Sequence, residues 1–135
     1  MFTHVVVGSN DLAKSKQFYD AVFAAIGGNP GMDMGSRIAY MHNGSNFMVT
    51  TPINGEAATH ANGGTIGFSM SGPEQTDAWH AAGVAAGGQS CEDPPGPRDL
   101  GFAKLYLAYL RDPDGNKLCA MYPLGQKGVF PMRLL

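Results

Sequence analysis

The sequence predicts an α+β fold in which two βαβββ modules form a cupped, mixed sheet with helices on its outside. Two observations carry this prediction. Residues 44–52 and residues 115–123 share the pattern Gly-x-x-apolar-x-apolar-x-x-Pro, which indicates that one unit occurs twice. Each copy also opens with a short apolar strand and an alanine-rich helix that ends in Gly-Gly. Because such folds build their site between the copies, residues at equivalent strand positions are the candidates for chemistry.

The length of the chain fits one domain. Its 135 residues are enough to bury most of the surface of a single folded unit. We therefore expect one domain over residues 1–135, with a first module over residues 1–52 and a second module over residues 64–125. The polar, glycine-rich segment 53–64 is expected to be a surface connection between them.

The first module is expected to contain one helix and several strands. Residues 2–7 are apolar and β-branched, which is typical of a strand. Ser9, Asn10 and Asp11 supply capping oxygens for a helix over residues 12–26, which a Gly-Gly pair then ends. Residues 37–42 and 46–51 are predicted to be two strands, since the Asn-Gly dipeptide between them is favoured in tight hairpins.

The second module is expected to repeat this order. Residues 65–70 are predicted to be a strand, and residues 73–86 a helix with proline in its first turn. Residues 89–102 contain several prolines, which preclude a regular interior strand, so we expect an irregular segment. Residues 104–110 and 117–122 then form a hairpin around Asp-Pro-Asp-Gly, a sequence with the residues of a type I turn.

Composition excludes several classes of function. The net charge is −2 with no basic stripe, so a nucleic-acid partner is not expected. The apolar stretches are shorter than the roughly 20 residues that cross a bilayer, so no membrane association is expected. Two cysteines and the absence of a leader pattern favour the reducing cytoplasm. Charged residues are only 15% of the chain, which is compatible with a homodimer interface.

Two segments carry a resemblance to a known family. Residues 4–12, His-Val-Val-Val-Gly-Ser-Asn-Asp-Leu, and residues 111–117, Arg-Asp-Pro-Asp-Gly-Asn-Lys, resemble the vicinal oxygen chelate superfamily. That superfamily includes glyoxalase I, extradiol dioxygenases and bleomycin resistance proteins. The resemblance implies paired βαβββ modules that form a cupped site around a divalent metal. It also implies metal ligands in the first and last strand of each module.

Carried over by position, the four metal-ligand places are occupied by His4, Met48, Thr65 and Cys119. Only His4 is a standard ligand for a hard divalent ion, and the thioether of Met48 suits soft ions. Zinc sites use three or four protein donors, which this set does not supply. We therefore expect no cofactor, with Met48 and Thr65 as substrate-binding residues. A divalent metal held by His4 remains the alternative.

Other residues are candidates for catalysis or binding. Cys119 becomes a reactive thiolate if the His4 imidazole lies beside it; otherwise it is a small buried apolar residue. Tyr106 and Tyr109 point to opposite faces of one strand, so one of them lines the cup; we take Tyr106 as catalytic and Tyr109 as substrate-binding. Arg98, in the proline-rich segment, either grips a carboxylate or phosphate of a ligand or is a solvated loop charge.

Two functions follow from these residues and the resemblance. The first is a small-molecule enzyme of glyoxalase type, a lyase, isomerase or dioxygenase, that polarises a carbonyl or enediolate. It would use a metal on His4, with a partner-supplied or non-standard ligand set, or His4 with Cys119 and a tyrosine. The second is a binder, similar to bleomycin resistance proteins, that holds an apolar or aromatic small molecule. The unusual ligand set favours a metal-free protein.

Overall fold

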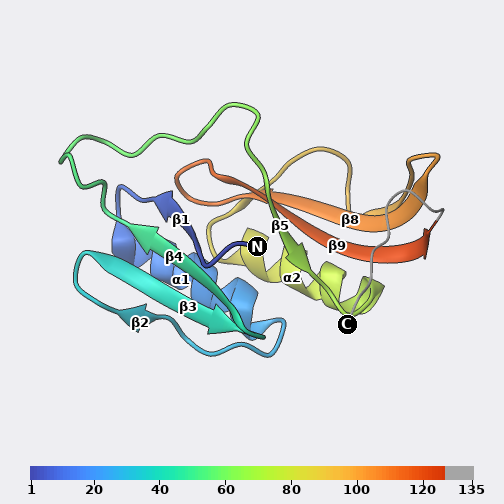
Figure 1. Cartoon of the computed structure of the whole chain (residues 1–135), viewed down its shortest axis with the longest axis horizontal. Helices are drawn as coiled ribbons and strands as arrows, with labels where there is room; N and C mark the ends of the chain where they lie inside the picture. Colours follow the sequence, from blue (N-terminus) through green and yellow to red (C-terminus); the bar gives the residue numbers. More distant parts are fainter. Residues whose placement is uncertain (127–135) are drawn as a thin grey trace.

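The computed structural model describes residues 1–126, which form two sheets, each backed by one helix (Figure 1). The first module contains β1 (Val5–Gly8), α1 (Leu12–Ala24), β2 (Met32–Asp33), β3 (Arg37–His42) and β4 (Ser45–Thr50). These strands make the first sheet, in the order β1-β4-β3-β2. Strand β1 is parallel to β4, and the other neighbours are antiparallel.

The second module repeats this arrangement with one additional strand, β7 (Gly96–Asp99). It contains β5 (Ile66–Ser69), α2 (Pro73–Ala85), β6 (Gln89–Ser90), β7 (Gly96–Asp99), β8 (Ala103–Arg111) and β9 (Lys117–Gln126). The second sheet has the order β5-β9-β8-β6, and β7 also pairs with β8. Strand β5 is parallel to β9, as β1 is to β4. The prediction of an α+β fold with two βαβββ modules is confirmed.

The segment that was expected to be irregular, residues 89–102, contains β6 and β7. Both strands pair with the same neighbour, β8, so they lie at the edge of the second sheet. An edge position explains how Pro97 fits in a strand, because its missing amide donor can face away from the ladder. The prolines do exclude an interior strand, but the prediction that the whole segment is irregular was wrong, because an edge strand tolerates proline.

Two turns were predicted correctly from their residues. Asn43 and Gly44 join β3 to β4 with φ angles of 48° and 82°, which glycine tolerates and few other residues do. Between β8 and β9, the amide of Gly115 donates to the carbonyl of Asp112 at 2.9 Å, as a type I turn requires.

One hydrophobic core joins the modules. The two helices contact each other, and each packs on its own sheet. Buried side chains from both modules form one cluster: Phe18, Tyr19, Val22, Phe23, Ile26, Ile38, Tyr40, Phe47, Val49, Met70, Trp79, Ala108, Leu110, Leu118 and Ala120. We call the sheet faces that are turned away from the helices the inner faces. A smaller cluster of Ala103, Leu105, Leu107 and Cys119 lies on the inner face of the second sheet.

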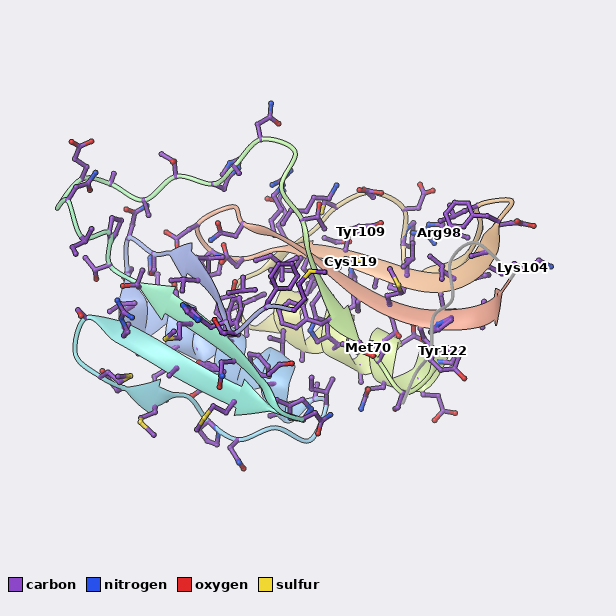
Figure 2. All side chains as sticks on the ribbon, viewed as in Figure 1. Met70, Arg98, Lys104, Tyr109, Cys119 and Tyr122 are labelled. Carbon is purple, nitrogen blue, oxygen red and sulfur yellow. The ribbon has the colours of Figure 1, made fainter. Side chains whose placement is uncertain are left out.

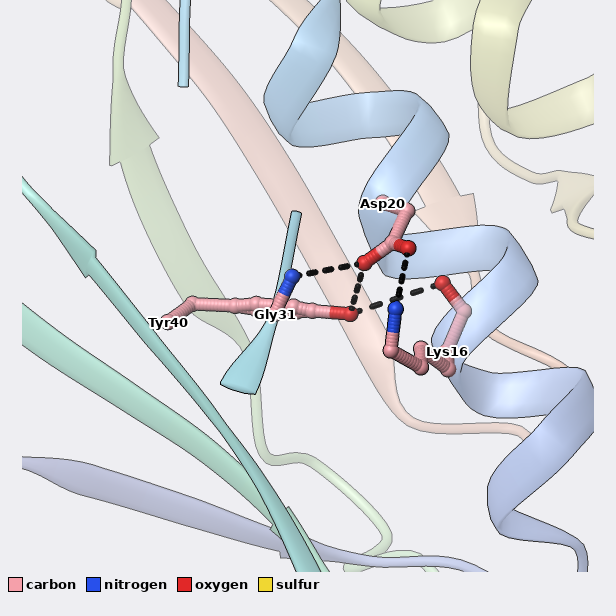
Figure 3. Close-up of polar contacts among 4 residues, drawn as sticks. All are labelled: Lys16, Asp20, Gly31 and Tyr40. Atoms are coloured by element: carbon pink, nitrogen blue, oxygen red, sulfur yellow. Dashed lines mark hydrogen bonds and ion pairs between the residues drawn. The ribbon is translucent and has the colours of Figure 1, made fainter. Parts of the chain in front are cut away.

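The connection between α1 and β2 is held by one carboxylate (Figure 3). Asp20 accepts hydrogen bonds from the Gly31 amide at 2.9 Å, the Tyr40 hydroxyl at 2.7 Å and Lys16 Nζ at 2.7 Å. A side chain at position 31 would lie 2.5 Å from Ile38 and Tyr40, so glycine is required there. This arrangement fixes the end of α1 over β3.

Among the described residues, no helix is long and apolar enough to cross a membrane.

Candidate functional site

An open cleft of about 830 Å³ lies between the two modules. Strands β1 and β5 each pair with a single strand, and residues of both line the cleft. Further walls come from the end of α1, from the β3–β4 hairpin and from the start of α2. Binding sites for small molecules commonly have volumes of about 300–1,000 Å³ and lie between structural units, so the size and the place of the cleft suit one.

Three phenylalanines from different elements meet at this cleft. Phe23 of α1, Phe47 of β4 and Phe68 of β5 have ring centroids 5.6–6.1 Å apart. Phe23 and Phe47 are buried, whereas Phe68 is only partly buried. The cleft therefore has an aromatic wall to which both modules contribute.

The polar groups of the cleft are neutral hydrogen-bonding side chains and two imidazoles. His4 is exposed, and its Nδ1 lies 2.7 Å from the Thr3 hydroxyl. His42 is partly buried, and its Nε2 lies 3.3 Å from the Asn43 amide nitrogen. Gln75 accepts a hydrogen bond from the Ser71 amide at 2.7 Å. Of the site residues predicted from sequence, only His4 lines this cleft.

Cys119 and Tyr109 lie together on the inner face of the second sheet, as neighbours on β9 and β8 (Figure 2). Cys119 is 4% exposed. Burial raises the pKa of its thiol, although a hydrogen bond from Tyr109 acts in the opposite direction. Burial, with the neighbouring Cys119, also raises the pKa of Tyr109 to about 12. Both groups are therefore protonated at neutral pH, which makes Cys119 a poor nucleophile.

Tyr109 lies beside an ion pair. Lys117 Nζ lies 5.0 Å from the centre of the Tyr109 ring, in a cation–π arrangement. The same ammonium group pairs with the carboxylate of Glu92. No hydrogen bond joins His4 to Cys119 in the part of the chain that the structure describes, so an imidazole that would activate the thiol is lacking there.

Arg98 and Tyr106 have structural partners. The guanidinium of Arg98 donates to the carbonyl oxygens of Asp93, Pro94 and Gly96 at 3.0–3.1 Å and so holds its own loop. The Tyr106 hydroxyl donates to Asp77 of α2 at 2.8 Å, and this bond is the main cause of the raised pKa of Tyr106. Tyr106 thus points to the helix side, while Tyr109 lies on the inner face.

The four family ligand positions do not form one donor set. Met48 lies on the inner face of the first sheet, with its sulfur 3.9 Å from Arg37 Nη1. Thr65 is exposed and lines a separate pocket of about 350 Å³ beside Lys117. Within residues 1–126, no three His, Cys, Asp or Glu side chains gather where they could hold a metal ion. The chemistry of these donors does not fit a hard divalent ion.

The cleft contains residues that sequence reasoning passed over. His42 lines the cleft, and the centre of its ring lies 6.2 Å from that of Phe23. The sequence does not single out Phe47 and Phe68. Phe47 lies on β4 and Phe68 on β5, and these strands do not occupy equivalent places in the two modules, so the duplication does not mark them.

The fold defines a class of small α+β proteins that are built from two paired modules. A family model, Glyoxalase/Bleomycin resistance protein/Dioxygenase superfamily, matches residues 2–120. The chain belongs to this superfamily. No protein with a curated description matches it.

Solved structures give the same assignment. The chain is similar to a glyoxalase/bleomycin resistance protein from Albidiferax ferrireducens T118, with 59% identity and a TM-score of 0.87 over 90% of this chain and 98% of that one. A glyoxalase-related enzyme from Fulvimarina pelagi shares 20% identity, with a TM-score of 0.68 over 90% of this chain and 86% of that one. The second likeness shows the fold alone.

Proposed function

We propose that this protein binds a small molecule in the cleft between its modules and does so without the metal of its superfamily. The observation that carries the proposal is the cleft itself, whose aromatic wall and neutral polar rim need no metal ligand set. The separation of His4, Met48, Thr65 and Cys119 supports the same conclusion, because two or more of them would have to converge on one ion.

A catalytic role for the Tyr109–Cys119 pair has less support. Both groups keep their protons at neutral pH. The neighbouring Lys117 and Glu92 already form an ion pair with each other. A thiol that must act as a nucleophile needs a lowered pKa, whereas burial has raised this one.

The proposal is tested by metal content and ligand binding in parallel. Untagged protein is incubated with Mn²⁺, Fe²⁺, Ni²⁺ or Zn²⁺, desalted and measured by plasma mass spectrometry. We expect substoichiometric metal for every ion. A small-molecule library is then screened by thermal shift, since a ligand that binds only the folded state raises the melting temperature.

His4→Ala separates the proposal from the metal enzyme. In a binder, the substitution leaves ligand affinity within roughly tenfold, about 1.4 kcal/mol. In a metal-dependent lyase, isomerase or dioxygenase, it removes both the bound ion and turnover. A stoichiometric ion that is lost in His4→Ala would therefore overturn the proposal.

A further inference from the structure

The charge of the cleft is its most selective property. Twenty residues of the described chain line it, and none of them is Asp, Glu, Lys or Arg. The protein has 20 such charged side chains, 9 basic and 11 acidic, so the walls of this cleft differ from the rest of the protein in carrying no charged side chain. A ligand that enters with a formal charge would find no side chain of opposite charge there at a pH above the titration range of histidine.

An unpaired charge is costly to place against such walls. Removing an ion from water without a partner of opposite charge is unfavourable, even after the site relaxes. An uncharged group with hydrogen-bonding atoms avoids this cost, because hydroxyl and amide groups of the wall can replace its water. Ser69, Ser71, Gln75, Asn43 and Asn46 supply such groups.

The apolar part of the wall favours a flat ring. Phe68 is partly buried and lies edge-on to Phe23 and Phe47, at interplanar angles of 86° and 70°. Aromatic side chains attract further rings in offset or edge-to-face geometry, which adds to the gain from apolar burial. Phe2, which is 80% exposed, also lines the cleft and adds a further aromatic surface to it.

From these features we infer that the ligand of the cleft is an uncharged aromatic molecule with one or two hydrogen-bonding groups. The inference rests on the proposed function, since it concerns the ligand of the same site. The inference distinguishes this chain from proteins that bind charged ligands. A binder of anionic thiol conjugates would need lysine or arginine on the walls, and a binder of polycations would need carboxylate side chains there.

The test uses three probes of one shape that differ in charge: 2-naphthol, 2-naphthoate and 2-naphthylmethylammonium. Their affinities are measured by isothermal titration above the titration range of histidine. We expect 2-naphthol to bind at least about tenfold more tightly than either ion. Equal affinities, or tighter binding of one ion, would overturn the inference and leave the proposed binding function in place.

Three variants locate the effect. Ser69→Asp puts a carboxylate at the exposed rim of the cleft, and it should weaken 2-naphthoate and strengthen the ammonium probe about fivefold or more. Ser36→Asp makes the same change at an exposed position away from the cleft and should alter neither. Phe68→Leu should weaken 2-naphthol. If none of the three probes binds, the inference about the ligand fails, whereas the proposed function fails only if no molecule of the library raises the melting temperature.

Discussion

At the scale of single residues, a buried hydrogen bond ties the two modules together. The Tyr19 hydroxyl of α1 donates to Asp112 at 2.6 Å, and Asn116 donates to the same carboxylate oxygen at 2.8 Å. Burial and the neighbouring Asp112 raise the pKa of Tyr19, so its hydroxyl stays a donor. The Asp-Pro-Asp-Gly sequence is thereby engaged both in a turn and in the contact between the modules.

Tyr19→Phe removes this donor and should destabilise the fold by about 1.5–3 kcal/mol, the range for hydrogen bonds to charged groups. Urea unfolding followed by circular dichroism measures the loss. Tyr106→Phe is the matched control, because it deletes a hydroxyl–carboxylate bond at the surface and should cost at most about 0.5 kcal/mol. Equal losses in the two variants would show that the Tyr19 bond has no special role.

Asp20 gives a prediction about pH. Burial alone would raise its pKa, but hydrogen bonds from Gly31, Lys16 and Tyr40 lower it below 3.8. The pKa of Asp20 is therefore lower in the folded state than in the unfolded state. The stabilisation that these hydrogen bonds give is present above pH 3.8 and is lost as the pH falls through the folded-state pKa. The stability difference between the wild type and Asp20→Asn should therefore be constant near neutrality and shrink in acid. A difference that grows below pH 3.8 would contradict this mechanism.

At the scale of elements, the close approach of α2 to its neighbours depends on one glycine. A side chain at position 83 would lie 2.3 Å from Leu110 and 3.1 Å from Val22, both of which are buried. Helix propensity favours Gly83→Ala by up to about 1 kcal/mol, but overpacking costs about 1–3 kcal/mol. We expect packing to win, with a net loss of stability.

The same chemical unfolding experiment checks the Gly83 prediction against Gly125→Ala. Position 125 lies in β9 with nothing within 4 Å of an added side chain and no positive φ angle, so that variant should be neutral within about 0.5 kcal/mol. If Gly83→Ala proves more stable than the wild type, Leu110 must be able to move aside.

How well the elements could be predicted depended on whether local sequence determines them. Both helices began at the predicted residues, because caps and proline act locally. Helix α1 ended at Ala24, before the predicted residue 26, since the Gly28 amide turns back to the Phe23 carbonyl at 2.7 Å. Strand β1 began at Val5 rather than residue 2, because its start is defined by pairing with Phe47. The local sequence pattern does not determine which residues of a distant strand pair with a given strand.

At the scale of the whole molecule, the site was harder to predict than the fold. A cleft lies between the modules, where the duplication predicted the site, and strand parity correctly separated Tyr106 from Tyr109. Carrying the ligand positions over by resemblance assumes that four strand residues converge on one ion. Whether they converge depends on how the two sheets are placed relative to each other around β1 and β5. The aromatic wall could not be distinguished from core by sequence, because Phe23, Phe47 and Phe68 serve as both.

The shared core makes a final prediction, that the two modules unfold as one unit. Trp79 is the only tryptophan of the chain and is 1% exposed in α2, so its fluorescence reports on the second module. Ile38, 1% exposed in β3, belongs to the first module, and Ile38→Val should cost about 0.5–1.5 kcal/mol through the loss of one methyl group. Because residues of both modules form one cluster, this loss should shift the Trp79 transition in urea as much as the transition seen by circular dichroism. An unchanged Trp79 midpoint in Ile38→Val would mean that the second module unfolds independently, and a cleft built between the modules would then open without global unfolding.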